Sequence, residues 1–436
     1  MSAPPRRAFA AIDFGTSNSA VAVPAGDAGG TRLVALEAGQ PTMPTAVFYR
    51  SDPPEQHGEA PRQYGRAALA AYVEGHEGRL MRSMKSILGS SLVEQSTDVG
   101  AGRAVPYLDV IAGYLRHLKA LAEASLGQPI EQVVLGRPVF FVDDDPERDA
   151  RAQSALAEAA RRVGFAEPRF QYEPIAAALD HERQVSAEER VLVCDIGGGT
   201  SDFSLVRLAP ERRKRLDRKD DILANHGVHL AGTDFDRHVE LAAILPLLGY
   251  RAYGPPLRPG EAPREIPSGI YFDLATWHLI NTVYTPARLA EWRRMKAWFA
   301  DEDQHRRLME VLTQRLGHGL AAAAEQAKIE VAGAGRALID LQWLESGLAV
   351  SLDEAQAAAA IEADLARIVD AAAQTVRLAG VAPQSVQTLY FTGGSTGLAP
   401  LVQRIAALFP QASVKRGDRF ASVVAGLGVY AEALYG

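Results

Sequence analysis

Two segments of this chain share one pattern of apolar and polar positions. In each, an apolar run that favours a β-strand leads into a polar turn and then into a second apolar run. The first comprises Ala8–Ile12, the turn Asp13–Asn18 and Ser19–Val23, and the second comprises residues 190–208 (RVLVCDIGGGTSDFSLVRL). Apolar runs on both sides of a short turn predict antiparallel hairpins. We therefore expect two similar halves facing one cleft, although no repeat extends beyond the hairpins.

Helical spacing of apolar residues follows each hairpin. The predicted helices lie in residues 106–126, 146–163, 174–183, 286–316, 318–333, 353–380 and 399–408, and further strands lie in residues 133–142 and 389–391. Strands that alternate with helices predict an α/β protein. Within residues 286–316, one face carries Leu289, Trp292, Met295 and Phe299. We interpret that stripe as core rather than as a ligand site.

Four further segments have a distinctive composition. Residues 51–64 are rich in proline and polar residues, and residues 253–269 hold five prolines and three glycines, so we expect irregular structure in both. Residues 210–221 (PERRKRLDRKDD) are interpreted as a solvated hairpin tip. The segment near the C-terminus, SVVAGLGVYAEAL, is predicted to be a helix that its two glycines loosen.

Composition narrows the class of protein. The 436 residues carry 46 Lys plus Arg and 53 Asp plus Glu, a net charge of −7, which argues against a nucleic-acid coat and a membrane-surface binder. Cys194 is the one cysteine, which excludes an intrachain disulfide framework and a cysteine-based zinc site. No secretory signal and no apolar stretch of about 18 residues is present, so we expect a cytoplasmic protein.

The first hairpin turn, Asp13-Phe14-Gly15-Thr16-Ser17-Asn18-Ser19, has the composition of an anion site. Its backbone N–H groups and hydroxyls could form a nest for phosphate. An aspartate at the end of a strand is placed to hold Mg²⁺ through the water molecules that this ion retains. The turn is not a Walker A loop, because no Gly-Lys-Ser/Thr follows. Taken alone, it is equally compatible with an ordinary polar turn.

Two other segments are rich in glycine. Asp195-Ile196-Gly197-Gly198-Gly199-Thr200-Ser201-Asp202 lies in the second hairpin, and Thr392-Gly393-Gly394-Ser395-Thr396-Gly397 follows the short strand at 389–391. Glycines weaken a strand pair, so three in a row indicate that a ligand approaches the backbone closely. The small residues at 392–397 would let a flat ring or a ribose lie against the backbone. Each segment alone could be a plain glycine turn.

Together, the three segments resemble the actin-like ATPase superfamily and, within it, the 70-kDa heat-shock chaperone (DnaK-like) family. That family's motifs match residues 13–19, 195–202 and 393–395, and further matches in family order lie at 84–89, 173–178, 229–236 and 324–330. The resemblance runs from about residue 8 to 430. It implies a two-lobed α/β fold, each lobe a mixed β-sheet flanked by helices, with a nucleotide cleft between the lobes.

The resemblance also implies a division of the chain. Lobe I would comprise residues 1–186, with an outer subdomain at about 33–105. Lobe II would comprise residues 187–436, with an outer subdomain at about 226–330. An enlarged insertion at about 245–318 would hold three of the four tryptophans. A C-terminal helix at about 420–436 could pack back on lobe I.

The family's site residues carry over by position. The phosphates would be held by the two hairpin turns, namely Gly15, Thr16, Ser17, Asn18, Gly197, Gly198, Gly199 and Thr200. Lys85 would contact the γ-phosphate, and Glu173 would orient the attacking water or accept its proton. Asp13 and Asp195 would hold Mg²⁺ through water. The nucleoside would be held by Glu325 and Lys328 at the ribose and by Gly393, Gly394 and Ser395 at the adenosine pocket. A solvated Lys85 and a Glu173 that only begins a helix remain alternatives.

The chain departs from the family pattern in two ways. It ends at Gly436, without the interdomain linker, peptide-binding β-sandwich and helical lid, so we expect a truncated member with the ATPase domain only. Gly397 stands where the family has an arginine that stacks on the base, Ala332 replaces a serine, and Phe420 falls near an expected aspartate. A stacked arginine contributes about 0.5–2 kcal/mol, so we expect weaker or differently selective nucleotide binding.

The expected function is that of an ATP-binding, chaperone-like ATPase. It would bind ATP and ADP with Mg²⁺, hydrolyse ATP slowly and couple the nucleotide state to lobe opening, with an unknown protein partner or client and no nucleic acid or membrane. The alternative is a nucleotide-dependent switch or scaffold with negligible turnover. A small-molecule kinase of the sugar-kinase branch fits residues 173–178 and 229–236 less well. An actin-like filament protein would show nucleotide-dependent sedimentation.

Overall fold

The chain forms two compact units. The structure, a computed structural model, describes residues 8–26, 29–51, 62–100, 102–142, 145–256, 258, 260–418 and 421–436. Unit 1 comprises Met1–Val228, Ala371–Thr396 and Ile405–Gly436, and unit 2 comprises His229–Asp370 and Gly397–Arg404. Most of the predicted loop at 51–64 lies outside the described residues. The division into lobes at residues 186 and 187 stays a prediction.

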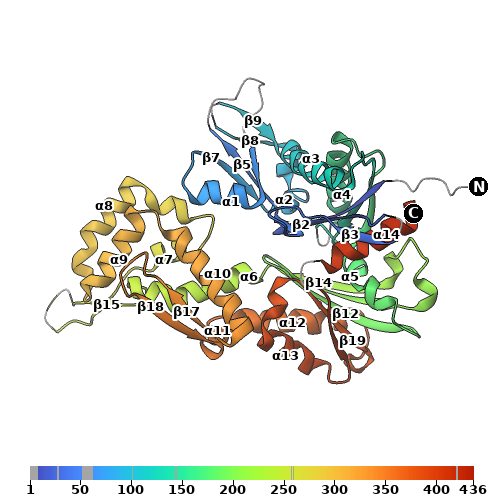
Figure 1. Ribbon diagram of the computed structural model, residues 1–436. Coiled ribbons are helices and arrows are strands. Elements are labelled where there is room, and N and C mark those ends of the chain that lie inside the picture. Colours follow the sequence, from blue (N-terminus) through green and yellow to red (C-terminus); the bar gives the residue numbers. More distant parts are fainter. Residues whose placement is uncertain are drawn as a thin grey trace, which may run out of the picture. The chain divides into compact units, whose positions relative to one another are not determined.

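Unit 1 contains two large mixed sheets with flanking helices (Figure 1). The first sheet comprises β1 (Phe9–Phe14), β2 (Asn18–Pro24), β3 (Thr31–Leu33), β4 (Thr42–Pro44), β10 (Gln132–Arg137) and β11 (Arg169–Tyr172). The second comprises β12 (Glu189–Ile196), β13 (Ser201–Leu208), β14 (Ile222–Val228), β19 (Thr388–Thr392) and β20 (Ser413–Arg416). Smaller sheets comprise β5 (Ala46–Arg50), β6 (Arg62–Tyr64) and β7 (Gly78–Arg82), and β8 (Ser96–Asp98) and β9 (Ala104–Pro106).

The helices of unit 1 are α1 (Gly65–Val73), α2 (Met84–Ile87), α3 (Tyr107–Leu126), α4 (Pro146–Arg162), α5 (Glu173–Glu182) and α14 (Ser422–Tyr435). Two more, α12 (Glu362–Leu378) and α13 (Ala399–Leu408), run across the boundary between the units. In the part of the chain that the structure describes, no helix is both long and apolar enough to cross a membrane.

The two large sheets have the same strand order and directions. The first runs β3-β2-β1-β10-β11 and the second runs β14-β13-β12-β19-β20. In each sheet, the first three strands of this order pair antiparallel. The third of them, β1 or β12, then pairs in parallel with the fourth strand, and the fourth pairs in parallel with the fifth. The predicted α/β fold with mixed sheets is therefore confirmed. Asp13 and Asp195 occupy equivalent places, one residue before the ends of β1 and β12.

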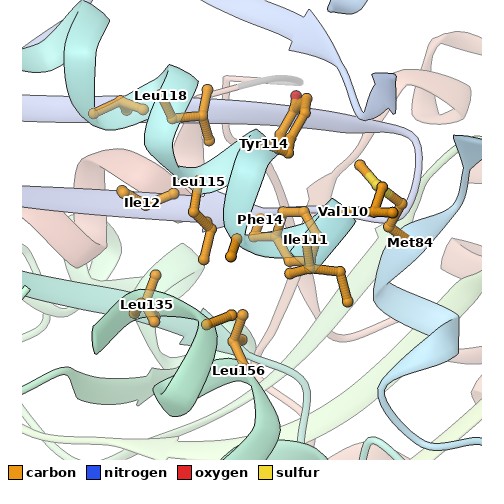
Figure 2. Close-up of a cluster of buried hydrophobic side chains, with 14 of the residues drawn as sticks. Ile12, Phe14, Met84, Val110, Ile111, Tyr114, Leu115, Leu118, Leu135 and Leu156 are labelled. Carbon is orange, nitrogen blue, oxygen red and sulfur yellow. The ribbon is translucent and has the colours of Figure 1, made fainter. Parts of the chain in front are cut away.

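The core beneath the first sheet comes from α3. Val110, Tyr114 and Leu118 recur every four residues, so they lie on one face of the helix, and all three are buried. Figure 2 shows this face against Ile12 and Phe14 of β1. The Tyr114 hydroxyl donates to the Pro44 carbonyl at 3.0 Å, which satisfies the buried phenol. The packing therefore fixes the strand that carries Asp13.

Two glycines let α14 approach its neighbours closely. A Cβ at Gly426 would lie 1.9 Å from the Ala176 carbonyl oxygen of α5, and one at Gly428 would lie 2.5 Å from Thr31 Oγ1. The helix is ordered from Ser422 to Tyr435 and packs on α5 and β1. The predicted helix is therefore confirmed, and its two glycines permit contact that a side chain would block.

The charged segment at 210–221 is not a solvated tip throughout. Arg218 and Asp221 are buried. Arg218 donates to both carboxylate oxygens of Glu182, at 2.9 and 2.7 Å, and also to Asp221, which pairs with Arg212 as well. The expectation failed because the main partner, Glu182, comes from the end of α5. Arg215 is exposed, as the charge pattern predicted.

Unit 2 is mainly helical. Its strands are β15 (Tyr253–Gly254), β16 (Arg264–Glu265), β17 (Arg336–Asp340) and β18 (Ala349–Asp353). Its helices are α6 (Gly232–Val239), α7 (Gly269–Leu274), α8 (Pro286–Arg294), α9 (Glu302–Thr313), α10 (Gly317–Ala334) and α11 (Glu354–Ala360). The helix predicted over 286–316 is interrupted after α8, and Asp301 caps α9 by accepting from the Asp303 N–H. Trp292 and Phe299 are buried, which confirms the core interpretation.

Two neighbouring acids are buried in unit 2. Glu240 follows α6, begins a π-helical turn and is 1% exposed. Burial and then the charge of Asp236 raise the pKa of Glu240 well above its usual range. Burial raises the pKa of Asp236 to about 6, although Lys328, whose Nζ lies 2.6 Å from Oδ1, lowers it. Glu325 and Asp234 raise it further. Both acids therefore hold protons more tightly in the folded chain than in the unfolded chain.

We expect this pair to make stability fall as the pH rises. The folded state binds more protons than the unfolded state above the ordinary carboxyl pKa, so the free energy of unfolding decreases through that range. Glu240→Gln removes one contribution, so it should stabilise the protein at pH 7 and have much less effect near pH 4, measured by urea denaturation. The control is Glu291→Gln, at an exposed position of α8. Parallel pH profiles for the altered and unaltered proteins would contradict this assignment.

We expect Gly426→Ala to destabilise the protein by about 1–3 kcal/mol, because the added carbon overpacks the contact with Ala176. The matched control is Gly333→Ala in α10, where a Cβ would meet no atom within 4 Å. That change should stabilise the protein by up to about 1 kcal/mol, since alanine favours helix. Urea denaturation of both variants measures the difference. If the two changes have the same effect, α14 does not depend on this close approach.

Candidate functional site

The two hairpin turns of unit 1 lie against each other. A Cβ at Gly15 would lie 2.2 Å from the Asn18 carbonyl oxygen, so the first turn is too tight for a side chain there. In the second turn, the Gly197 N–H donates to the Thr200 carbonyl at 3.0 Å. A Cβ at Gly198 would lie 2.6 Å from Ser17 Oγ. The structure therefore brings together the two segments that the sequence predicted to hold phosphate.

The third glycine segment packs on the second turn. Gly393 has a φ of 89°, a conformation that favours glycine, and its Cβ would lie 2.4 Å from the Ile196 carbonyl oxygen. The same Cβ would lie 2.8 Å from Asp195 Oδ1. Ser395 Oγ donates to the Gly197 carbonyl at 2.7 Å. Gly394 begins the short 3-10 helix that follows. Gly393, Gly394 and Ser395 thus lie beside the end of β12.

Lys85 and Glu173 form an ion pair. Lys85 Nζ donates to Glu173 Oε1 at 2.5 Å, and the two side chains are 11% and 14% exposed. Glu173 is the first residue of α5, where the helix dipole favours a carboxylate. Lys85 lies in α2, which follows Ser83 at a φ of 52°. Because both residues are largely buried and paired, the solvated-lysine alternative does not describe Lys85.

The aspartates beside this pair lie in a strongly electrostatic environment. Burial, followed by the charge of Glu173, raises the pKa of Asp13 to about 7. Burial, Asp202, Glu173 and Asp13 together raise the pKa of Asp195 to about 8. Lys85 opposes both shifts. Burial lowers the pKa of Lys85 itself, but Glu173 and Asp13 raise it by more, so the lysine stays charged at neutral pH.

This donor set fits Mg²⁺. Two buried carboxyl groups, at the ends of β1 and β12, lie near one cation, Lys85. Burial disfavours the charged forms of these carboxyl groups, and a bound divalent cation would stabilise those forms. No group of three His, Cys, Asp or Glu side chains is arranged to hold a metal ion among the described residues. Mg²⁺ usually keeps several of its water molecules, so Asp13 and Asp195 would act on it through water.

The residues predicted to reach the ribose lie in unit 2. Lys328 donates to the Gly232 carbonyl at 3.2 Å and pairs with Asp236, so α6 holds its side chain. Glu325 lies one helical turn earlier in α10. Ala332 lines a cavity of about 20 Å³ together with Leu398. The ribose and adenosine roles stay predictions, and Phe420 lies outside the described residues.

The sequence analysis assigned no role to two residues that shape this site, Asp202 and Gly136. Asp202 acts on the pKa of both Asp195 and Lys85. It was visible as the last residue of the motif at 195–202. Gly136 in β10 makes room for Glu173, because a Cβ there would lie 3.2 Å from the Glu173 side chain. A glycine inside a strand was the signal, since it often marks a close approach.

Comparison with known proteins agrees with this geometry. A family model described as Hsp70 protein matches residues 9–242. The chain is 26% identical over 458 aligned positions to the "Chaperone protein HscA homolog" of Azoarcus sp. (strain BH72), an alignment that covers all of this chain and 60% of that relative. It is 32% identical over 241 positions to "Chaperone protein dnaK1" of Parasynechococcus marenigrum (strain WH8102), covering 52% of this chain and 34% of that relative.

The matched region contains most of the site. Residues 9–242 are 234 of the 436 residues and include both hairpin turns, Lys85 and Glu173. The chain spans at most about three fifths of the length of these two relatives. The family match over more than half of the chain, with the buried ion pair and both glycine turns inside it, shows that this chain belongs to the Hsp70 family.

Proposed function

We propose that this chain is an ATP-binding ATPase of the Hsp70 chaperone type, which hydrolyses ATP slowly with Mg²⁺ and couples the nucleotide state to a change between open and closed lobes. The observation that carries the proposal is the buried Lys85–Glu173 pair beside Asp13 and Asp195, at the meeting point of two glycine turns. Phosphoryl transfer requires positioning and charge neutralisation more than covalent participation.

The glycine turns would hold the β- and γ-phosphates of ATP as substrate. Backbone N–H groups of Gly15–Asn18 and Gly198–Thr200 would donate to phosphate oxygens, while the Gly197 N–H holds the second turn closed on the Thr200 carbonyl. Such an arrangement needs no side-chain reorganisation. Lys85 has three N–H donors, of which one goes to Glu173. The others would donate to a γ-phosphate oxygen and neutralise charge there.

Glu173 would act on the attacking water. Its Oε2 would accept a hydrogen bond from the water while Oε1 remains paired with Lys85, and the carboxylate would take the proton as the water oxygen bonds to the γ-phosphorus. The bond from the γ-phosphorus to the bridging oxygen would break, and ADP would leave with that oxygen. Mg²⁺, when bound, would neutralise phosphate charge, and Asp13 and Asp195 would orient its water shell.

Both relatives are named as chaperones. We therefore propose a protein client or partner for this chain as well, and a cytoplasmic location. A ligand shifts a conformational balance only through its different affinities for the two states. ATP would accordingly favour whichever of the open and closed states binds it more tightly. ADP would shift the balance back if it lacks the same preference.

The experiment measures phosphate release from ATP with Mg²⁺ by purified protein. Glu173→Gln should lower the rate at least about 100-fold, because a general base contributes about 10²–10⁴-fold. Lys85→Ala should lower it at least about 100-fold as well, because one donor that stabilises transition-state charge contributes about 10²–10³-fold. The matched control is the pair Lys119–Glu123 in α3, whose Nζ–Oε1 distance is also 2.5 Å. Lys119→Ala and Glu123→Gln should leave the rate within about twofold. Unchanged rates in the Lys85 and Glu173 variants would overturn the assignment of these residues.

A nucleotide-dependent switch with negligible turnover is the second candidate. Gly397 and Ala332, where the family has an arginine and a serine, favour it because they would weaken the nucleoside site. Thermal unfolding with ATP, with ADP and without nucleotide separates the two functions. A ligand at 100 times its Kd adds about 2.7 kcal/mol to the free energy of unfolding. Stabilisation without phosphate release would indicate the switch, and stabilisation with release would indicate the ATPase.

A further inference from the structure

A buried ion pair in unit 2 holds the lysine that is predicted to reach the ribose. Lys328 Nζ of α10 lies 2.6 Å from Asp236 Oδ1 of α6 and donates to the Gly232 carbonyl at 3.2 Å. The two side chains of the pair are 15% and 17% exposed. An ammonium group has three N–H donors, so these two contacts with α6 leave one N–H for a ligand.

A second acid lies beside this pair. Glu240 follows Asp236 by four residues and is 1% exposed. Burial and the charge of Asp236 raise the pKa of Glu240 well above its usual range, whereas Lys328 lowers the pKa of Asp236, which is about 6. Two neighbouring buried carboxyl groups do not readily ionise together. At neutral pH, Asp236 is therefore the charged acid and the partner of Lys328.

Lys328 is the cation that compensates Asp236. The other charged groups of α6 and of its neighbours that could act on this acid are Asp234, Arg237, His238, Glu325, Glu330, Glu354 and Asp364. Asp234 and Glu325 raise the pKa of Asp236. His238 pairs with Asp364 at 3.1 Å, the Arg237 guanidinium lies over the Phe272 ring, and Glu330 and Glu354 are exposed.

The groups that Lys328 and Glu325 present fit a pair of neighbouring hydroxyls. They lie three residues apart in α10, so they share one face of the helix, and Glu325 is exposed. A hydroxyl accepts from an ammonium group and donates to a carboxylate, and a ribose carries two adjacent hydroxyls. A free lysine side chain loses much rotamer entropy when it binds a ligand. A residue that holds Lys328 in place beforehand reduces that cost.

We propose that Asp236 is a positioning residue for nucleotide binding, which holds the Lys328 ammonium in place to donate to a ribose hydroxyl and so makes the chain select nucleotides with the vicinal diol. This inference rests on the proposed binding of ATP and ADP, with Lys328 at the ribose. When Asp236 takes up a proton, Lys328 loses its charged partner and keeps the Gly232 carbonyl. The selectivity for the diol should therefore be present above a pH of about 6 and decline as the pH falls through that value.

The experiment measures the Kd of ADP and of 2′,3′-dideoxy-ADP with Mg²⁺ for the full chain, by calorimetry at pH 7.5. The dideoxy nucleotide has the same base and phosphates but lacks both ribose hydroxyls. The test variant is Asp236→Asn, which removes the charge and keeps the shape of the side chain. The matched control is Asp273→Asn, because Asp273 also pairs with a cation of unit 2, Arg288, at 2.6 Å.

We expect Asp236→Asn to raise the Kd of ADP about 10-fold at pH 7.5, which corresponds to one charge-assisted hydrogen bond. The Kd of the dideoxy nucleotide should stay within about twofold, and the control should bind both nucleotides as the unaltered chain does. At pH 5, the ADP difference between the variant and the unaltered chain should shrink to about twofold, because Asp236 is then mostly protonated and resembles asparagine. Asp13 and Asp195 titrate in both proteins, so they do not create this difference.

Three results would overturn the proposal while the proposed function stands. One is equal weakening of both nucleotides by Asp236→Asn, which would indicate a general disturbance of the site. Another is an ADP difference that stays constant from pH 7.5 to pH 5. The third is an unaltered chain that binds ADP no better than the dideoxy nucleotide. An unaltered chain that binds neither nucleotide would refute the proposed function and this inference together.

A second variant, Lys328→Gln, keeps the proposal falsifiable if Asp236→Asn does not fold. It should also weaken ADP about 10-fold at pH 7.5 and spare the dideoxy nucleotide. Because Lys328 acts only while charged Asp236 holds it, this loss should also shrink at pH 5. A loss that is the same at both pH values would show that Lys328 acts without Asp236, which overturns the positioning role.

Discussion

The burial of several carboxylates around Lys85 is the constraint on which the rest of unit 1 depends. Asp13, Glu173 and Asp195 each lie on a different element. Glu173 and Asp13 raise the pKa of Lys85, and Lys85 in turn lowers the pKa of Asp195. Buried charges are unfavourable unless their partners are held in place. The strands β1 and β12 and the helices α2 and α5 must therefore keep fixed positions. The two sheets of identical topology supply two of these positions, because each places an aspartate near the end of its equivalent strand.

Helix α5 shows how the surrounding structure meets that constraint. It begins at Glu173, which pairs with Lys85, and ends at Glu182, which pairs with Arg218. Between these ends, α14 approaches so closely that Gly426 leaves no room for a side chain beside Ala176. Breaking a buried ion pair leaves an uncompensated charge, which costs about 3–5 kcal/mol. Both ends of the helix are thus fixed by charge and its middle by packing.

The same principle governs the charged segment at 210–221. Glu182 and Asp221 neutralise Arg218 in the interior, so the end of α5 holds the segment against unit 1. Asp149 of α4 pairs with Arg137 of β10 in the same way. Buried ion pairs thus join elements that are distant in the sequence, and each pair depends on both partners being held in place.

The sequence by itself determined the local elements and the chemistry of the turns. The hairpins were readable because apolar runs flank polar turns, and the glycine segments because glycine is unfavourable in a strand unless the backbone must be approached. Lys85 and Glu173 were identified from short motifs within a family resemblance. These features depend on residues that are close in sequence, so a linear pattern is enough to predict them.

Only the tertiary structure decided which distant groups meet. The pairing of Lys85 with Glu173, the contact of Gly198 with Ser17 and the burial of Arg218 against Glu182 each join residues from separate elements. The segment at 210–221 was misread for this reason, since its composition is that of a solvated turn and its burial comes from α5. Long-range ion pairs and close backbone contacts leave no periodic trace in the chain. Their strength depends on distance and burial, which exist only once the chain has folded.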